Sequence, residues 1–530
     1  QSPIPNPQSP LKLNKNIYIT KNIFEMNQKF IFKIIIKNKM SEPKKGENPE
    51  ISLHPFQPLP HDIRAESSES DRNGDLSTEP KLFKSKNKSS EIISTSSLQS
   101  SKKKSTILTA GLMMTNACLG TTIFTFALKA KTFGLVWLLV AAIVVGIVNY
   151  WTIMAGAKAS SKCEEDDYSE ITQKILGRKA RVILNCILVL YSYACMMCLL
   201  ALLFPLFGRF IQSIAYNNEY DSYTEFADKK WGKLFIKIPF YIGVALAISL
   251  MCLIDDINKL NFSSYISVGA VLYTLLVITG QCRSYYNYYK KNEYKEDDET
   301  THPNWTNLKN AFKKDLDFFK GMANLFCAYA CHPNIFPIYA GFKEKNGDRK
   351  EGLKKMSIST IFSTCLTTSL HIISITCSFL TDPVTPEDLI IYRKSKDSGK
   401  DILMAIAKLT IFIGLVFTLP IYYFTLRLCI ADSFMKGKIT PKFNTIFTFC
   451  SVFGCTIVAI IYDKILNYLS YIGGFISVFI CYLIPVLLYI KSHGKPITYW
   501  KNLIQFILAI ILCVIGITAG ILTIIDDVTG

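Results

Sequence analysis

Long apolar runs separated by short polar segments make up the chain from about residue 105 onward. Eleven runs contain no Asp, Glu, Lys or Arg: 107–128, 135–157, 182–208, 238–254, 262–282, 321–342, 356–381, 409–426, 443–462, 465–490 and 502–525. A hydrocarbon core of ~30 Å needs roughly 20 helical residues, and nearly all of the runs reach that length. They are too long for the ~10-residue strands of a membrane barrel. The pattern therefore predicts eleven transmembrane α-helices.

Composition supports an integral membrane protein. The 530 residues are 50% hydrophobic and only 19% charged, with a mean hydropathy of +0.25. The apolar residues are concentrated in 105–530, which we expect to form one eleven-helix transmembrane domain. The sequence has no P-loop, GxSxG, HExxH or dinucleotide fingerprint, so an enzyme is not expected.

The first 104 residues have a different character, being rich in Ser and Lys and poor in apolar side chains. Such a composition cannot bury enough surface to offset the entropy of the chain, and it predicts a disordered tail. Residues 1–39 are basic and rich in Asn and Ile, and we expect the native chain to begin at Met40. A targeting segment is the alternative interpretation.

Charge placement predicts the orientation. The net charge is +18, and the Lys and Arg residues flank the apolar runs, as in membrane anchoring rather than nucleic-acid binding. The basic segments 174–181 and 343–355 fall on one side, which is predicted to be cytoplasmic together with the amino terminus. The 283–317 loop is then external, where the Asn304 glycosylation pattern would be usable. The plasma membrane and a vacuolar or lysosomal membrane both remain open.

Two runs are interrupted by small or polar residues near their middle. The first contains Asn116-Ala117-Cys118-Leu119-Gly120-Thr121-Thr122, and the sixth contains His332-Pro333-Asn334-Ile335-Phe336-Pro337. A helix broken at membrane depth is tolerated only where its freed backbone groups face protein or a watery cavity. Paired breaks in corresponding helices of two repeats mark the substrate and ion site of many transporters. The sequence therefore predicts a midplane site between these two runs.

Three segments resemble the sodium-coupled neutral amino acid transporters of the amino acid/auxin permease superfamily. They are CHPNIFPIY at 331–339, the Asn116-Ala117-x-x-Gly120 motif of the first run, and LPIYYFTLR at 419–427. The resemblance implies a LeuT-like fold, with an inverted five-plus-five helix repeat plus an eleventh helix. It also implies secondary active transport and a sodium site at Asn116 and Thr418. The chain departs from the family pattern at Thr122, Asn334 and Val416.

The substrate expected from the residues themselves is a small neutral amino acid. Half-helices offer free N–H groups and a positive dipole end to a carboxylate, and free carbonyls to an ammonium group. None of the runs contains Asp or Glu to hold a second positive charge, which disfavours cationic substrates. The predicted substrate-binding residues are Asn116, Gly120, Thr121, Thr122, Tyr191, His332, Pro333 and Asn334.

No cofactor is expected other than the coupling ion. Neutral oxygens of Asn116 and Thr418 suit sodium, whereas His332 and His371 are the two intramembrane groups that could carry a proton. For His332 we favour a neutral ring bonded to a nearby carbonyl, and for His371 a structural role. A membrane amino acid sensor with little flux, a channel and a structural subunit are the competing functions.

Three further features admit simple interpretations. Lys408 and Arg427 bracket the eighth run and are interpreted as interface anchors. Tyr191 and Tyr193 are candidates to cover the substrate, although packing is the simpler role. The Gly473-Gly474 pair permits either close helix approach or a gate hinge.

Overall fold

The computed structural model describes residues 93–94, 106–119, 121–126, 129–130, 134–215, 226, 234–254, 261–292, 317–342, 349–381, 389–393, 401–435, 438–462, 464–494 and 496–529. The predictions for residues 1–39 and Met40, for most of the tail, for Gly120 and for Asn304 lie outside these residues. The described part from residue 93 onward belongs to one compact unit.

Helices account for nearly all of the described residues, which confirms the all-α membrane class. The longer helices in chain order are α5 (Leu135–Cys163), α7 (Arg178–Ala215), α9 (Leu234–Cys252), α10 (Asn261–Asn292), α14 (Arg349–Thr381), α15 (Ile402–Phe434), α16 (Pro441–Ile461) and α19 (Trp500–Thr529). The shorter ones are α3 (Ile107–Cys118), η1 (Thr121–Phe124), α6 (Tyr168–Leu176), α12 (Asp317–Ala328), η4 (His332–Asn334), α13 (Ile335–Ala340), η5 (Ile390–Tyr392), α17 (Ile465–Tyr471), η6 (Ile472–Ser477), η7 (Phe479–Leu483) and α18 (Ile484–Ser492).

Each predicted run falls on helix, but not all of them are continuous. Within the described ranges, eight helices are long and apolar enough to cross a membrane. The first run is divided into α3 and η1, and the sixth into α12, η4 and α13. The fourth, Ile238–Cys252 within α9, is apolar but shorter. The two interrupted runs are the two in which the sequence predicts a break, and the other runs are helical over their described residues.

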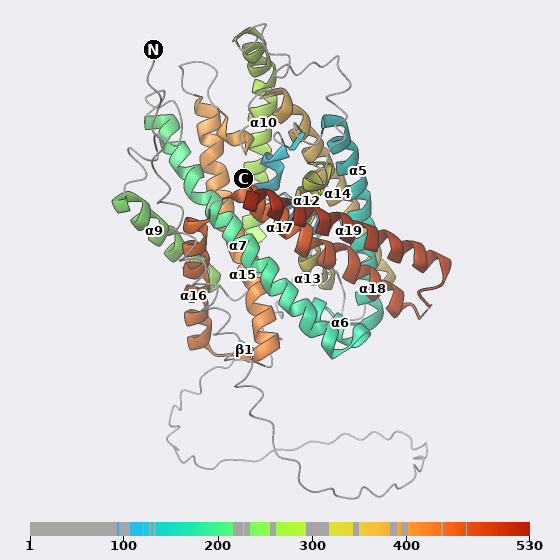
Figure 1. Ribbon diagram of the computed structural model, residues 1–530. Helices are drawn as coiled ribbons and strands as arrows, with labels where there is room; N and C mark the ends of the chain where they lie inside the picture. The colour runs from blue at the N-terminus through green and yellow to red at the C-terminus, as the bar shows by residue number, and fades with distance from the viewer. Residues whose placement is uncertain are drawn as a thin grey trace, which may run out of the picture. The chain divides into compact units, whose positions relative to one another are not determined.

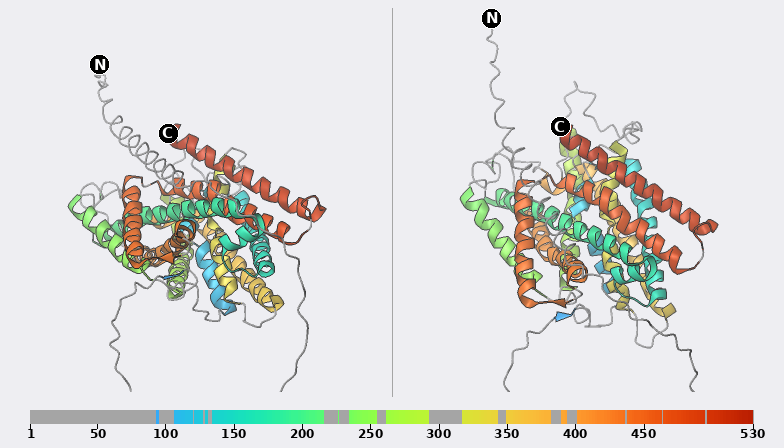
Figure 2. Two further views of the ribbon diagram at one scale, coloured as in Figure 1. Left: turned by 90° about the horizontal axis from the view of Figure 1, so that it is seen from below. Right: turned by 60° about the horizontal axis from the view of Figure 1, so that its bottom comes forward.

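Segments far apart in sequence lie side by side in the bundle. In Figure 1, α7 runs diagonally across α15, and hydrogen bonds join Arg181 and Asn185 of α7 to Asp432 of α15. The α3 helix lies along α14, where Thr115 Oγ1 donates to Ser363 Oγ at 3.0 Å. Both views in Figure 2 show α19, drawn in red, lying along the outside against α18.

The outer and inner faces differ as expected for a protein surrounded by lipid. Large apolar side chains remain exposed on the outer helices, including Ile147, Leu276, Ile457 and Val514. Inside, one continuous core of buried residues extends through the bundle and includes both helix breaks. The exposed apolar belt is what a bilayer would cover.

A short strand pair involves the two described residues of the predicted tail. Ile93–Ser94 forms β1 and pairs antiparallel with β2, Lys438–Ile439, in the connection between α15 and α16. The two described residues of the tail thus contribute backbone hydrogen bonds to this short connection.

The Gly473-Gly474 pair lies in η6, a π-helical turn, and permits close helix approach. A Cβ on Gly473 would lie 1.7 Å from the carbonyl oxygen of Ala323 in α12. A Cβ on Gly474 would lie 2.7 Å from the carbonyl oxygen of Gly516 in α19. The close helix approach that the sequence offers as one interpretation of the pair is therefore present.

Candidate functional site

The first predicted break lies between α3 and η1. The α3 helix ends at Cys118, and the Leu119 N–H closes its last turn on the Thr115 carbonyl at 2.8 Å. Thr121 begins η1, and the buried Thr122 accepts a hydrogen bond from Thr125 N–H at 3.1 Å through its carbonyl. The Thr122 hydroxyl has no hydrogen-bond partner among the described residues. The change from α-helix to 3-10 turn therefore falls where the sequence predicts it.

The second predicted break lies between α12 and α13. After α12 ends at Ala328, the Cys331 N–H bonds to the Tyr329 carbonyl at 3.0 Å, and η4 follows. Pro333 occupies the start of η4, where its missing N–H and fixed φ favour a new helical turn. The Asn334 N–H bonds to the Cys331 carbonyl at 3.0 Å, while its side chain makes no cap to α13. Pro333 and Asn334 are both partly buried.

Tyr191 reaches this second break from α7. Its hydroxyl donates a 3.0 Å hydrogen bond to the carbonyl of Ala330, one of the residues between α12 and η4. Its ring makes an edge contact with Tyr422 of α15, with centroids 6.1 Å apart. Tyr193 points elsewhere, because its hydroxyl pairs with Ser451 of α16 at 3.1 Å. Of the two tyrosines, Tyr191 is the one placed at the predicted site.

His332 is fully buried within the second break. Its Nε2 lies 2.9 Å from the hydroxyl of Thr152 on α5, so the expected carbonyl partner is replaced by a hydroxyl. Thr152 sits on the same face of α5 as Gly156, whose close approach to Phe336 brings α5 against the broken helix. The Nδ1 atom of His332 has no hydrogen-bond partner within the described segments.

His371 of α14 packs between aromatic rings. Phe126 lies 5.2 Å away and Tyr329 lies 5.0 Å away, both in edge arrangements. It is completely buried, and neither ring nitrogen has a hydrogen-bond partner in the described part of the chain. These contacts are those of a packing residue.

Asn116 and Thr418 each contact a serine of α10. Asn116 Nδ2 donates to Ser264 Oγ at 3.3 Å, and Thr418 Oγ1 lies 2.8 Å from Ser267 Oγ. Ser264 and Ser267 are three residues apart, so they share one face of α10. The Thr418 hydroxyl also donates to the Gly414 carbonyl at 2.8 Å. Four buried polar side chains from three helices thus form two hydrogen-bonded pairs along α10.

The serines of α10 were missed from the sequence, although a detectable signal was there. Ser264 and Ser267 stand at helical spacing in an apolar run, which is the pattern of a polar stripe facing other helices. Thr152 was missed for a different reason. Its importance depends on how α5 packs against the break, which no local pattern in 135–157 reveals.

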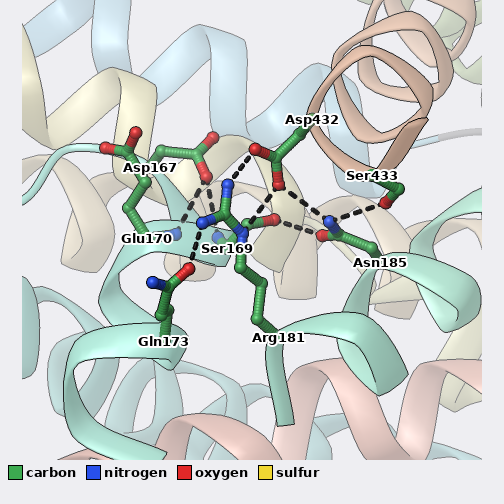
Figure 3. A network of polar contacts seen from close by, with 8 residues as sticks. All are labelled: Asp167, Ser169, Glu170, Gln173, Arg181, Asn185, Asp432 and Ser433. Atoms are coloured by element: carbon green, nitrogen blue, oxygen red, sulfur yellow. Dashed lines mark hydrogen bonds and ion pairs between the residues drawn. The ribbon is translucent and has the colours of Figure 1, made fainter. Parts of the chain in front are cut away.

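A polar network at the ends of α6, α7 and α15 was also not anticipated (Figure 3). Arg181 forms an ion pair with Asp432, with Nε 2.9 Å from Oδ2, and also donates to Gln173. Asn185 donates to Asp432 at 2.9 Å and to Ser433 at 3.0 Å. Arg181 of the basic cluster at 174–181 therefore binds groups on α6 and α15 and links three helices.

Asp167 begins α6 beside this network. Its carboxylate accepts the N–H groups of Ser169, at 2.8 Å, and Glu170, at 3.2 Å. Burial raises the pKa of Asp167, although these hydrogen bonds and the nearby Arg181 oppose the shift. The next residue, Tyr168, packs on Phe336 of α13 with ring centroids 4.4 Å apart. Its hydroxyl donates to the Ile480 carbonyl at 2.8 Å. The α6 helix thus connects the network to the half-helix beyond the second break.

The interpretation of Lys408 and Arg427 as interface anchors is wrong. Both side chains are buried, with exposed fractions of 7% and 2%. Lys408 Nζ donates to Ser213 Oγ at 2.8 Å, and an Arg427 guanidinium nitrogen donates to the Ile254 carbonyl at 3.2 Å. The reason is that α7, α9 and α10 cover α15, so its charged side chains meet protein groups.

Comparison with known proteins identifies the family of the chain. The family model for transmembrane amino acid transporter proteins matches residues 103–526. The chain belongs to this family. The putative sodium-coupled neutral amino acid transporter 11 of Macaca fascicularis is 21% identical over 378 residues, covering 68% of this chain and 72% of that protein. The solved structure of Mhp1, a nucleobase-cation-symport-1 family transporter, covers 79% of this chain and 91% of its own, with 12% identity and a TM-score of 0.44.

Proposed function

We propose that this transmembrane amino acid transporter carries small neutral amino acids by secondary active transport, with sodium as the coupling ion. The observation that supports it most directly is the pair of interrupted helices, α3–η1 and α12–η4–α13, in a chain of this family. Free backbone groups at such breaks suit the carboxylate and ammonium groups of an amino acid. Tyr191 supports the second break by binding one of its carbonyls.

Sodium coupling is supported by the oxygens around α10. A hard cation can be held by neutral oxygens, and Asn116, Ser264, Ser267 and Thr418 supply them in a buried place. The name of the macaque relative also contains sodium coupling and a neutral amino acid substrate. The second candidate is proton coupling, for which His332 is the titratable side chain placed at the second break.

The proposed orientation in the membrane follows the pattern of basic residues. The amino terminus and the 343–355 segment lie in the cytoplasm, and the protein occupies the plasma membrane or a vacuolar or lysosomal membrane. Alternating access would move the broken helices relative to α7 and α15.

Uptake of labelled alanine and glutamine into proteoliposomes tests the proposal. An inward sodium gradient should drive accumulation, and a pH gradient alone should not. Ser267→Ala should raise the sodium concentration needed for half-maximal uptake, whereas Ser249→Ala is the matched control. Ser249 is also a buried serine, but its hydroxyl bonds to the Ala245 carbonyl within α9. Accumulation with a pH gradient alone would replace sodium with protons, and binding without uptake would indicate a sensor.

A further inference from the structure

A pocket of about 290 Å³ opens between α5, α14, α18 and α19, away from the Asn116 and Thr418 oxygens. The polar and aromatic residues that line it are Tyr150, Trp151, Lys158, Ser357, Tyr489 and Gln505. Lys158 provides the positive charge, and its Nζ lies 5.8 Å from the centroid of the Tyr489 ring. The pocket therefore combines one cation, several hydroxyls, an amide and aromatic walls.

The pocket lies close to one end of its helices. Lys158 is near the carboxyl end of α5, Tyr489 is near the carboxyl end of α18, and Gln505 is near the amino end of α19. At a rise of about 1.5 Å per residue, each lies within about two turns of its helix end. The same ends carry further basic residues, namely Lys162, Lys350, Lys354, Lys491 and Lys501. By its charge this is the predicted cytoplasmic side, so the pocket sits at the level of lipid headgroups.

The polar atoms of the pocket define which chemical groups its ligand must carry. The hydroxyls of Tyr150 and Ser357 lie 3.2 Å apart, and their hydrogen bond uses only one of their two hydrogens. The second hydroxyl hydrogen and the Lys158 ammonium group therefore suit an anion or another hydrogen-bond acceptor. Gln505 Oε1 is buried and has no hydrogen-bond partner among the described residues, so it calls for a donor. A ligand with both an anionic acceptor and a hydrogen-bond donor fits the pocket, as does a phosphate beside an amine or hydroxyl group.

We propose that this pocket binds the headgroup of a glycerophospholipid that has hydrogen-bond donors, such as phosphatidylserine, phosphatidylinositol or phosphatidylethanolamine. The phosphate lies toward Lys158, and the donor lies toward Gln505. Phosphatidylcholine has the phosphate but no N–H or O–H group. The acyl chains have a surface beside the pocket, because Ile504, Ile507 and Ile511 of α19 are exposed. This proposal does not depend on the transported substrate.

Lipid titration of the purified full-length protein, followed by native mass spectrometry and thermal unfolding, tests the site. Phosphatidylethanolamine and phosphatidylcholine have equal net charge, but only the first has N–H donors. Tighter binding of phosphatidylethanolamine would therefore show that the pocket recognises a hydrogen-bond donor. Gln505→Leu should abolish that preference. Phosphatidylserine adds a negative charge, and Lys158→Gln should weaken its binding about fivefold. Neither readout requires transport activity, so failure here is distinct from failure of the proposed function.

Lys491→Gln is the matched control, because it removes a charge at the same end of α18 but outside the pocket. It should retain both lipid preferences. Lys158→Arg keeps the positive charge and should also retain both lipid preferences. This variant therefore separates an effect of the charge from an effect on folding. Equal binding of phosphatidylethanolamine and phosphatidylcholine to the unmodified protein would overturn the proposal. Equal losses in Lys158→Gln and Lys491→Gln would do so too, because they would indicate general surface attraction.

Discussion

The hydroxyl of Tyr191 donates a hydrogen bond to the carbonyl oxygen of Ala330 across 3.0 Å. Tyr191 comes from the middle of α7, whereas Ala330 belongs to the interruption between α12 and η4. A carbonyl freed by a helix break in a bilayer needs a partner, and here a neighbouring helix supplies it. The bond ties the position of the broken helix to α7.

Removing this bond should impair transport more than stability. Tyr191→Phe keeps the ring and its contact with Tyr422 but leaves the Ala330 carbonyl without its donor. We expect a several-fold loss of uptake and a loss of about 1–3 kcal/mol in unfolding free energy. Tyr193→Phe is the matched control, because it removes a similar bond to Ser451 on α16. Equal uptake by the two variants would exclude a role for Tyr191 at the break.

The bond between His332 and Thr152 gives a second prediction. Thr152→Val keeps the shape of the side chain but removes the hydroxyl from His332 Nε2, leaving the fully buried ring without that partner. We expect a loss of about 1–3 kcal/mol in unfolding free energy and reduced uptake, measured by thermal unfolding and proteoliposome assay. Thr152→Ser retains a hydroxyl and should be close to the unmodified protein. Identical behaviour of Val and Ser variants would contradict the proposed bond.

The other buried histidine should respond in the opposite direction. His371 has two ring nitrogens without partners among the described residues, and it contacts Phe126 and Tyr329. An apolar residue of similar volume removes the desolvation cost of these nitrogens. We expect His371→Leu to unfold at the same or a higher temperature and to keep the pH profile of uptake. A changed pH profile would instead give His371 a part in proton coupling.

The sequence predicted which helices break but not what surrounds the breaks. Pro333 and the polar stretch around Asn116 carry local signals, because proline and small polar residues disturb any helix that contains them. The partners of these residues depend on tertiary packing. Thr152 meets His332 only because α5 lies against the broken helix, and Arg427 is buried only because neighbouring helices cover α15.

The close packing of η6 predicts a steric effect at Gly473. A Cβ there would lie 1.7 Å from the Ala323 carbonyl oxygen, so α12 and η6 would have to separate. We expect Gly473→Ala to lose about 1–3 kcal/mol or more in unfolding free energy. Gly269→Ala on α10 is the control, because nothing lies within 4 Å of its Cβ position. There the better helix propensity of alanine should leave stability unchanged or raised. Tolerance of Gly473→Ala would show that this contact is looser than the structure indicates.

Asp401 gives a prediction for acid stability. It precedes α15 and accepts hydrogen bonds from Gln281 at 2.9 Å, Tyr285 at 3.0 Å and Met404 N–H at 3.1 Å. Burial by itself raises the pKa of Asp401, but these bonds and the nearby Arg393 outweigh it and lower the pKa. Because the folded pKa lies below the ordinary value of about 3.9, the ionised carboxylate stabilises the protein above that pH. That contribution is lost as the pH falls through the lowered pKa.

Asp401→Asn isolates the charge, since asparagine remains a good helix cap. At pH 7 the variant should lose about 1.5–3 kcal/mol in unfolding free energy, because charged hydrogen bonds become neutral and the ion pair between Arg393 and Asp401 is lost. Below about pH 4 the difference between the two proteins should shrink, as Asp401 takes up a proton in the unmodified chain. Chemical unfolding measured from neutral to acidic pH follows this convergence. A difference that stays constant with pH would show that the ionised carboxylate has no stabilising role, and that the asparagine variant acts through altered packing alone.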